Sequence, residues 1–293
     1  MIRYFLPSAG IYGGVKVGYQ LAEMLRELGR RVVVASPDGE AAQWIRCAVP
    51  VVDRDEALSG LGPSDVAIFS LPHDYTPLAG TGAQLVFHCQ GTDPRIDPIL
   101  RDPEVTILTG WAQATEYVRE GFGREPIEIG ISISDVFYGG GIVSKEDRVG
   151  YMPRRGRSLA RRCERRSRRL EFVPIEGRTE GEVADALARA SFFLATAEGE
   201  WFGLPALEAM AAGCVVVSAP VLGGLEYLRS GENSVVAPSE ALPDVLAELA
   251  RPGARDERDR LRRGALATAG RYRRTCQRER LRRVLPTIPE LIA

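Results

Sequence analysis

Short apolar segments alternate with longer amphipathic stretches along most of the chain. In the first half, the apolar segments that predict β-strands lie at residues 2–6, 31–35, 66–71, 85–89 and 105–109. Apolar residues recur at helical spacing at 15–28, after the first strand, and at 112–120, after the last. Such alternation is typical of a parallel sheet covered by helices on both faces.

The alternation is interrupted at residues 130–147, which contain three consecutive glycines and no clear periodicity. We interpret this stretch as a linker between domains. A second series then provides strands at 149–152, 170–173, 192–195 and 214–218, and helices at 158–169, 180–189, 203–212, 241–250 and 257–285. The sequence therefore predicts two Rossmann-like α/β domains, residues 1–140 and 141–273, with a helical tail at 274–293. A chain of 293 residues is long enough for both domains.

Composition narrows the class of protein. Hydrophobic residues make up 45% and charged residues 26% of the chain, as in soluble globular proteins. No apolar run approaches the ~20 residues needed to span a bilayer, and no signal-peptide pattern is recognisable, so we expect a cytoplasmic protein. The five cysteines are scattered and only two histidines exist, which argues against a disulfide framework or a zinc site.

The charge is distributed unevenly. The first 145 residues contain 12 basic and 18 acidic side chains, whereas the remainder contains 26 basic and 21 acidic ones. The basic half is therefore the better candidate for binding an anionic ligand. The acidic half disfavours docking on an anionic membrane, although a weak peripheral contact is left open. No nucleic acid is expected as a partner.

The segment EGEWFGLPALEAM, residues 198–210, joins a predicted strand to a predicted helix that starts near Gly203. Unpaired N–H groups and a partial positive charge at a helix N-terminus favour an anion such as a diphosphate. Gly203 would let that anion approach the backbone. The carboxylates of Glu200 and Glu208 suit sugar hydroxyls. The alternative is a solvated loop acid and an ordinary helical ion pair.

The longer segment EGEWFGLPALEAMAAGCVVVSAPVLGGLEYLRSGENSVV closely resembles the signature of the retaining GT-B glycosyltransferases of family four, the glycogen-synthase-like group. Its matching features are Glu-x7-Glu around Phe-Gly-Leu-Pro, an apolar strand after a Gly, and a Gly-x-x-Glu turn. GISISDVF similarly resembles the family's linker. The resemblance implies two Rossmann-like domains facing across a cleft, with the C-terminal helix packing back on the first domain. It also implies transfer of a sugar from a nucleotide-diphosphate sugar with retention. We expect no essential metal ion and no other cofactor.

The resemblance also assigns roles within this segment. Glu208 would bind the ribose hydroxyls of the nucleotide, and Glu200 would be the catalytic carboxylate beside the transferred sugar. The amides around Gly203 and Leu204 would hold the diphosphate, with Phe202 in the same donor site. The two acids would then bracket a nucleotide sugar.

The family places an Arg at the end of the first strand of the second domain and a Lys about six residues later. Arg154 fits the first position and would stabilise the departing diphosphate. No Lys is nearby, so Arg155, Arg157 or Arg161 must substitute, with Arg155 the expected donor ligand. Residues 154–169 hold nine Arg and one Glu, and the alternative for most of them is a solvated helix face.

Candidate residues in the first domain carry weaker signals. Gly13 and Gly14 precede a helix and could approach the donor phosphate, although many such turns carry Gly for packing. His88 ends an apolar strand, where ligands bind in α/β domains, and the family often has a catalytic His near the sugar. His73 competes for that role. Asp53-Arg54-Asp55 resembles a short metal-binding motif of another transferase fold, but we interpret it as a helix cap.

The acceptor cannot be identified from the sequence: a saccharide, a lipid-linked molecule or a small molecule would each fit. UDP, GDP and dTDP sugars all remain open as donors. Two other classes of function are alternatives. An NAD-dependent oxidoreductase would need G-x-G-x-x-G after the first strand, and PSAGIYGGVKVG has its glycines in another register. A non-catalytic module that binds sugar nucleotides or a partner protein would bind the donor without turnover.

Overall fold

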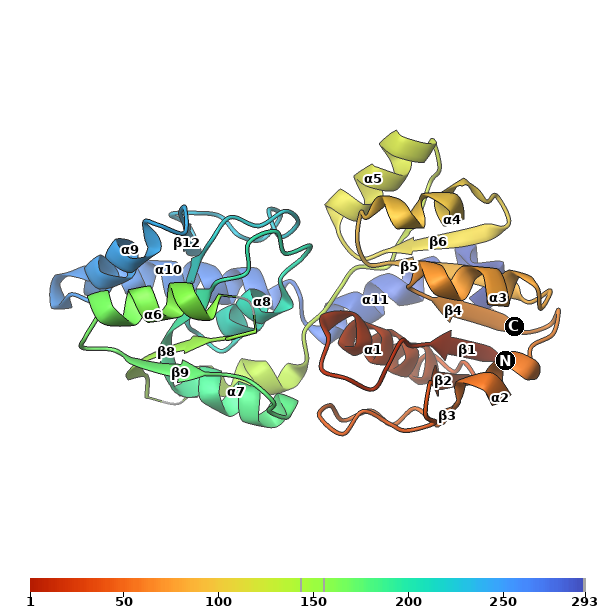
Figure 1. The fold of residues 1–293 in the computed structure, drawn as a ribbon, viewed down its shortest axis with the longest axis horizontal. Helices are drawn as coiled ribbons and strands as arrows, with labels where there is room; N and C mark the ends of the chain where they lie inside the picture. The colour runs from red at the N-terminus through yellow and green to blue at the C-terminus, as the bar shows by residue number, and fades with distance from the viewer. Residues whose placement is uncertain (143, 155, 292–293) are drawn as a thin grey trace. The chain divides into compact units, whose positions relative to one another are not determined.

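The chain forms two compact units in the computed structural model, which describes residues 1–142, 144–154 and 156–291 (Figure 1). The first unit contains Met1–Ser132 and the chain from Thr275 onward, and the second contains Ile133–Arg274. Residues 135–142 form a 3-10 helix rather than an irregular linker, and the division falls before them.

The first unit is built on a parallel seven-stranded sheet with the order β3-β2-β1-β4-β5-β6-β7. Its strands are β1 (Ile2–Phe5), β2 (Val32–Ser36), β3 (Val51–Asp53), β4 (Val66–Phe69), β5 (Gln84–Cys89), β6 (Val105–Thr109) and β7 (Ile127–Glu128). Its helices are α1 (Gly13–Glu27), α2 (Arg54–Ser59), α3 (Tyr75–Ala79), α4 (Asp97–Arg101), α5 (Ala112–Phe122) and α11 (Arg274–Val284). The strands β2 and β3 are added on one side of β1, and β4 to β7 on the other, so the strand order switches between β1 and β4. Ligands of open α/β sheets bind at the carboxyl ends of strands at such a switch point.

The C-terminal segment belongs to the first unit. Leu281, Leu285, Ile288 and Leu291 are buried in its hydrophobic core. The side chain of Gln277 accepts a hydrogen bond from Ser132 Oγ at 2.7 Å and donates to the Gly130 carbonyl at 2.6 Å. Burial of this apolar stripe and these polar contacts hold the tail against the first sheet.

The prediction of one continuous helix over 257–285 is wrong. The chain forms α10 (Arg255–Gly270), leaves the helical path, and resumes in α11. At the break, Ile133 N donates to the Tyr272 carbonyl at 3.0 Å, and Ile133 pairs with Arg273 in an isolated β-bridge. This pairing with a distant segment competes with the helical hydrogen bonds and explains the break.

The second unit has a parallel five-stranded sheet with the order β12-β11-β10-β8-β9. Its strands are β8 (Glu146–Tyr151), β9 (Glu171–Pro174), β10 (Ala190–Ala195), β11 (Val215–Ser218) and β12 (Ser234–Val236). Its other helices are α6 (Arg157–Arg166), α7 (Glu180–Arg189), α8 (Leu204–Ala211) and α9 (Leu242–Leu249). Helices α6 and α9 pack against each other, as do α8 and α10 (Figure 1). The central strands β10 and β11 are almost entirely buried, so their carboxyl ends are firmly positioned.

Candidate functional site

Loops that follow β8, β10 and β11 meet at the carboxyl edge of the second sheet. The backbone N–H groups of Leu222 and Gly223 both donate to the Glu200 carbonyl, each at 3.1 Å. These bonds join the loop after β10 to the loop after β11. Gly156, in the turn after β8, lies against Thr196, so closely that a side chain there would collide with it. The three loops therefore form one connected surface.

Helix α8 begins at this edge. Gly203 is its N-cap residue and has a left-handed backbone with φ of +84°, which favours glycine. Ala206 N donates to the Gly203 carbonyl at 3.1 Å, and Pro205 has no N–H group. The N–H groups of Gly203 and Leu204 precede this first bond of the helix. They are therefore the amides that α8 offers to an anion.

The two predicted carboxylates flank the start of α8. Glu208 lies one turn inside the helix and is only 4% exposed, whereas Glu200 is half-buried in the preceding loop. Burial first, and then interactions with Tyr272 and with the carboxylates of Glu200, Glu208 and Glu226, raise the pKa of Tyr227 well above its usual value. The structure thus brings Glu200 and Glu208 within electrostatic reach of the same buried tyrosine.

An aromatic cluster packs in and against the loop that precedes α8. The ring of Phe202 is buried, with its centroid 5.3 Å from that of Tyr227 and 6.0 Å from that of Tyr272. The Tyr272 hydroxyl donates a hydrogen bond to Glu226 Oε1 at 2.9 Å. Sequence reasoning did not select Tyr227, Tyr272 or Glu226 as site residues. Only Glu226 carried a signal, because it is the acid of the quoted Gly-x-x-Glu turn.

The predicted basic residues follow β8. Arg154 is exposed in the turn that Gly156 holds against Thr196, so the structure places it beside the loop after β10. Arg155 lies outside the described residues. Arg157 forms an exposed ion pair with Glu176 at 3.0 Å, and Arg161 is exposed on α6.

The first unit gathers its candidate residues at the corresponding edge. A Cβ atom on Gly14 would lie 2.6 Å from Gln90 Oε1, so the start of α1 is close to the residue that follows β5 by one position. Gln90 Nε2 donates to the Tyr4 hydroxyl at 3.2 Å, and that hydroxyl lies 2.7 Å from His88 Nδ1. Gly14 and His88 are therefore linked through Gln90 and Tyr4, which sequence reasoning missed because their positions are far apart in the chain.

The two histidines have different environments. His88 is 1% exposed, and burial lowers its pKa from 6.5 to about 4, so the ring is neutral. Its Nε2 has no hydrogen-bond partner within the described part of the chain. The His73 side chain is 64% exposed, and its Nε2 lies 3.4 Å from Asp74 Oδ1. A role for either ring in binding the sugar stays a prediction.

Comparison with known proteins identifies the second unit. Residues 148–251 match the family model described as glycosyl transferases group 1. The second unit is a group 1 glycosyltransferase domain.

Relatives extend this comparison to other parts of the chain. An alpha-1,6-glucosyltransferase of Actinobacillus pleuropneumoniae is 48% identical over 48 residues, a match that covers 16% of this chain and 14% of the relative. Anabaena HepE in complex with UDP-glucose has a TM-score of 0.76 at 13% identity, covering 98% of this chain and 99% of HepE. Sucrose-phosphate synthase of Thermosynechococcus elongatus has a TM-score of 0.71 at 13% identity, covering 98% of both chains. The chain as a whole has the GT-B fold.

The Asp53-Arg54-Asp55 motif lies in the first unit, outside the residues that match the family model. Asp53 accepts hydrogen bonds from the backbone N–H groups of Asp55 and Glu56, at 2.8 and 3.1 Å, and caps α2. The prediction of a helix cap is confirmed.

Over residues 1–142, 144–154 and 156–291, no group of three or more His, Cys, Asp or Glu side chains is arranged to hold a metal ion. In the same ranges, no helix is both long and apolar enough to cross a membrane.

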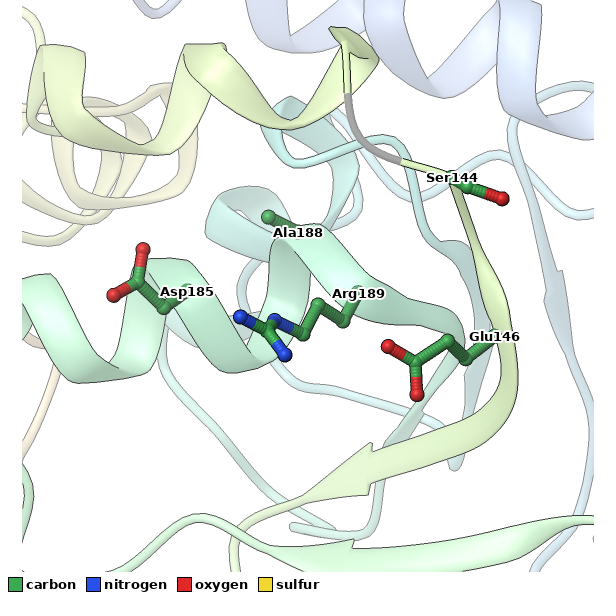
Figure 2. Close-up of a pocket in the computed structure, with 5 residues that line it drawn as sticks. All are labelled: Ser144, Glu146, Asp185, Ala188 and Arg189. Carbon is green, nitrogen blue, oxygen red and sulfur yellow. The ribbon is translucent and has the colours of Figure 1, made fainter.

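A pocket of about 380 Å³ lies at the opposite edge of the glycosyltransferase domain, at the amino ends of β8 and β10. Its lining residues are Ser144, Glu146, Asp185, Ala188 and Arg189. Figure 2 shows the Arg189 side chain directed between the carboxylates of Asp185 and Glu146. None of the predicted donor residues lines this pocket, so it is separate from the candidate donor site.

Proposed function

We propose that this chain is a retaining glycosyltransferase that moves a sugar from a nucleotide-diphosphate sugar to an acceptor. The observation that carries the proposal is the surface at the start of α8. Two carboxylates, Glu200 and Glu208, flank two backbone amides in the domain that matches the group 1 glycosyltransferases. Carboxylates suit the hydroxyls of ribose and sugar, and helix N-terminal amides suit the diphosphate between them.

Each donor-site residue has a distinct role in this proposal. Glu208 accepts hydrogen bonds from the ribose hydroxyls, while the N–H groups of Gly203 and Leu204 bind the diphosphate. Arg154 adds positive charge as the diphosphate departs, which stabilises the developing charge of the leaving group. Glu200 lies beside the transferred sugar. Phe202 supports the loop through its buried ring.

The chemistry proceeds by front-face attack and needs no essential metal ion. The acceptor hydroxyl attacks the anomeric carbon from the side that the diphosphate leaves, and a phosphate oxygen of the donor takes its proton. Because attack and departure take place on the same face of the sugar, its configuration is retained without a protein nucleophile. The first unit supplies the acceptor side, where Gly13, Gly14 and His88 lie near the carboxyl edge of its sheet.

UDP-glucose is the first donor to test. Its choice rests on the Anabaena protein solved with UDP-glucose and on the relative named a glucosyltransferase. The alternative of a non-catalytic module predicts binding of the same donor without consumption. Turnover therefore separates the two functions.

The proposal is tested by proton NMR of UDP-glucose incubated with the full chain. With water as the surrogate acceptor, we expect slow release of UDP and glucose, with the α-anomer appearing before mutarotation mixes the two forms. Release of β-glucose first would contradict retention. Binding of UDP-glucose without release, with water or with a panel of saccharide and lipid-linked acceptors, would favour the non-catalytic module. A Glu200→Gln variant controls for contaminating hydrolases.

A further inference from the structure

A buried tyrosine holds the peptide group at the start of α8. Tyr227 is completely buried, and its hydroxyl donates to the Gly203 carbonyl at 2.7 Å. The Gly203 carbonyl is otherwise engaged by Ala206 N at 3.1 Å. The tyrosine therefore contacts the N-cap peptide directly, from a position 24 residues further along the chain.

The backbone of Tyr227 is itself fixed. Its N–H donates to the Gly224 carbonyl at 3.1 Å, and its carbonyl accepts from Asn233 Nδ2 at 2.7 Å. Asn233 is 2% exposed and also donates to Thr268 Oγ1 at 2.8 Å, in α10. The hydroxyl of Tyr227 is thus positioned by two hydrogen bonds at its own backbone and by a connection to a packed helix.

The hydroxyl stays a donor under all ordinary conditions. Burial and the neighbouring carboxylates raise the pKa of Tyr227, so the phenol remains protonated. Its ring packs against Phe202 and against Tyr272, with centroids 5.3 and 6.1 Å away. A Phe at this position would keep the ring contacts and lose only the hydrogen bond.

The geometry of the peptide bond connects this contact to the donor. The Gly203 carbonyl and the Leu204 N–H belong to one planar trans peptide group, in which they point in opposite directions. A donor that holds the carbonyl on the buried side therefore aims the N–H away from the core. Resting on the donor site proposed above, we propose that Tyr227 is a positioning residue that orients the Leu204 N–H toward the diphosphate of the nucleotide sugar.

This role separates the phosphates from the nucleoside. The ribose is assigned to Glu208, which lies one turn further along α8. Removing the Tyr227 hydroxyl should then weaken binding of the diphosphate and leave binding of the nucleoside unchanged. A tyrosine that merely stabilised the fold would affect both ligands equally.

The test compares Tyr227→Phe with a matched control, Tyr138→Phe. Tyr138 also donates its hydroxyl to a backbone carbonyl at 2.7 Å, that of Ala269 in α10. The full-length wild type and both variants are titrated with UDP by calorimetry and with uridine by NMR. Where the wild type prefers another base, the corresponding diphosphate and nucleoside are used.

We expect Tyr227→Phe to weaken UDP binding about fivefold to tenfold, the effect of one lost hydrogen bond, and to leave uridine binding unchanged. Tyr138→Phe should change neither. Equal losses for UDP and uridine, or no loss for either, would overturn the positioning role while leaving the proposed function intact. A wild type that binds none of the nucleoside diphosphates would overturn both.

Discussion

Replacing Gly203 with Ala tests the backbone conformation on which the proposed donor site depends. Two effects add in this variant. Alanine in the left-handed conformation at φ of +84° costs about 1 kcal/mol or more. In addition, the new Cβ would lie 2.9 Å from the Tyr227 hydroxyl, which is buried and cannot easily move away.

A matched control separates the two effects. Gly231 lies in the same unit with φ of +80°, and a Cβ there would meet nothing within 4 Å. Gly231→Ala therefore carries the backbone cost without the close contact. The effect of Gly→Ala on the unfolded chain is common to both variants and cancels in their difference. The remaining difference reports the loss of the hydrogen bond to Gly203, about 1 kcal/mol.

The assay is thermal unfolding of the full chain, with UDP affinity measured on the same samples. We expect Gly203→Ala to unfold about 2–4 °C below Gly231→Ala, the shift that corresponds to about 1 kcal/mol for a unit of this size. Gly203→Ala should also lose affinity for UDP, whereas Gly231→Ala should keep it. Equal midpoints and equal affinities would refute the argument that the contact between Gly203 and Tyr227 organises this site.

Three further outcomes are expected. Asp53→Ala should cost about 1 kcal/mol of unfolding free energy in denaturant titrations, and EDTA should not slow turnover in the variant or the wild type, since Asp53 is a helix cap. Burial lowers the pKa of His88 to about 4, so the unfolded chain binds more protons than the folded one between pH 4 and 6.5. Stability should therefore fall by about 3 kcal/mol as the pH drops through this range, and His88→Gln should flatten that slope. An equal slope in the wild type and the variant would contradict this account of His88. Arg154→Ala should lower kcat for UDP-glucose about 100-fold, whereas Arg168→Ala, which removes another exposed arginine of the same basic segment, should not.

The sequence predicts the central strands better than the edge strands. The runs that became β4, β10 and β11 are almost entirely apolar because these strands are buried on both faces. The strands β3, β7 and β12 have only two or three residues and lie at or near sheet edges, so they carry no readable period. The break at Tyr272 was missed for a different reason, because it depends on a backbone bond to Ile133.

Some residues of the candidate site could likewise be predicted from the sequence, and others could not. Glu200, Gly203 and Glu208 lie within nine residues, so their spacing and the strand-to-helix transition were enough to select them. The residues that support them could not be predicted from the sequence, because their contacts join positions that are far apart in the chain. The hydroxyl of Tyr227 reaches back 24 residues to Gly203, and Tyr4 contacts His88 across 84 residues. The local sequence pattern selects the candidate residues here, and only the folded structure shows which contacts hold them in place.

The most direct test of the central claim is calorimetric titration of the full chain with UDP, GDP, dTDP and ADP, and with their sugars. The same titrations are made with Glu208→Gln, which keeps the shape of the side chain and removes its charge. We predict that the wild type binds one base in preference to the others and that Glu208→Gln loses most of this affinity. Binding of none of these nucleotides, or equal binding by both proteins, would contradict the assignment of the α8 surface as a nucleotide-sugar site.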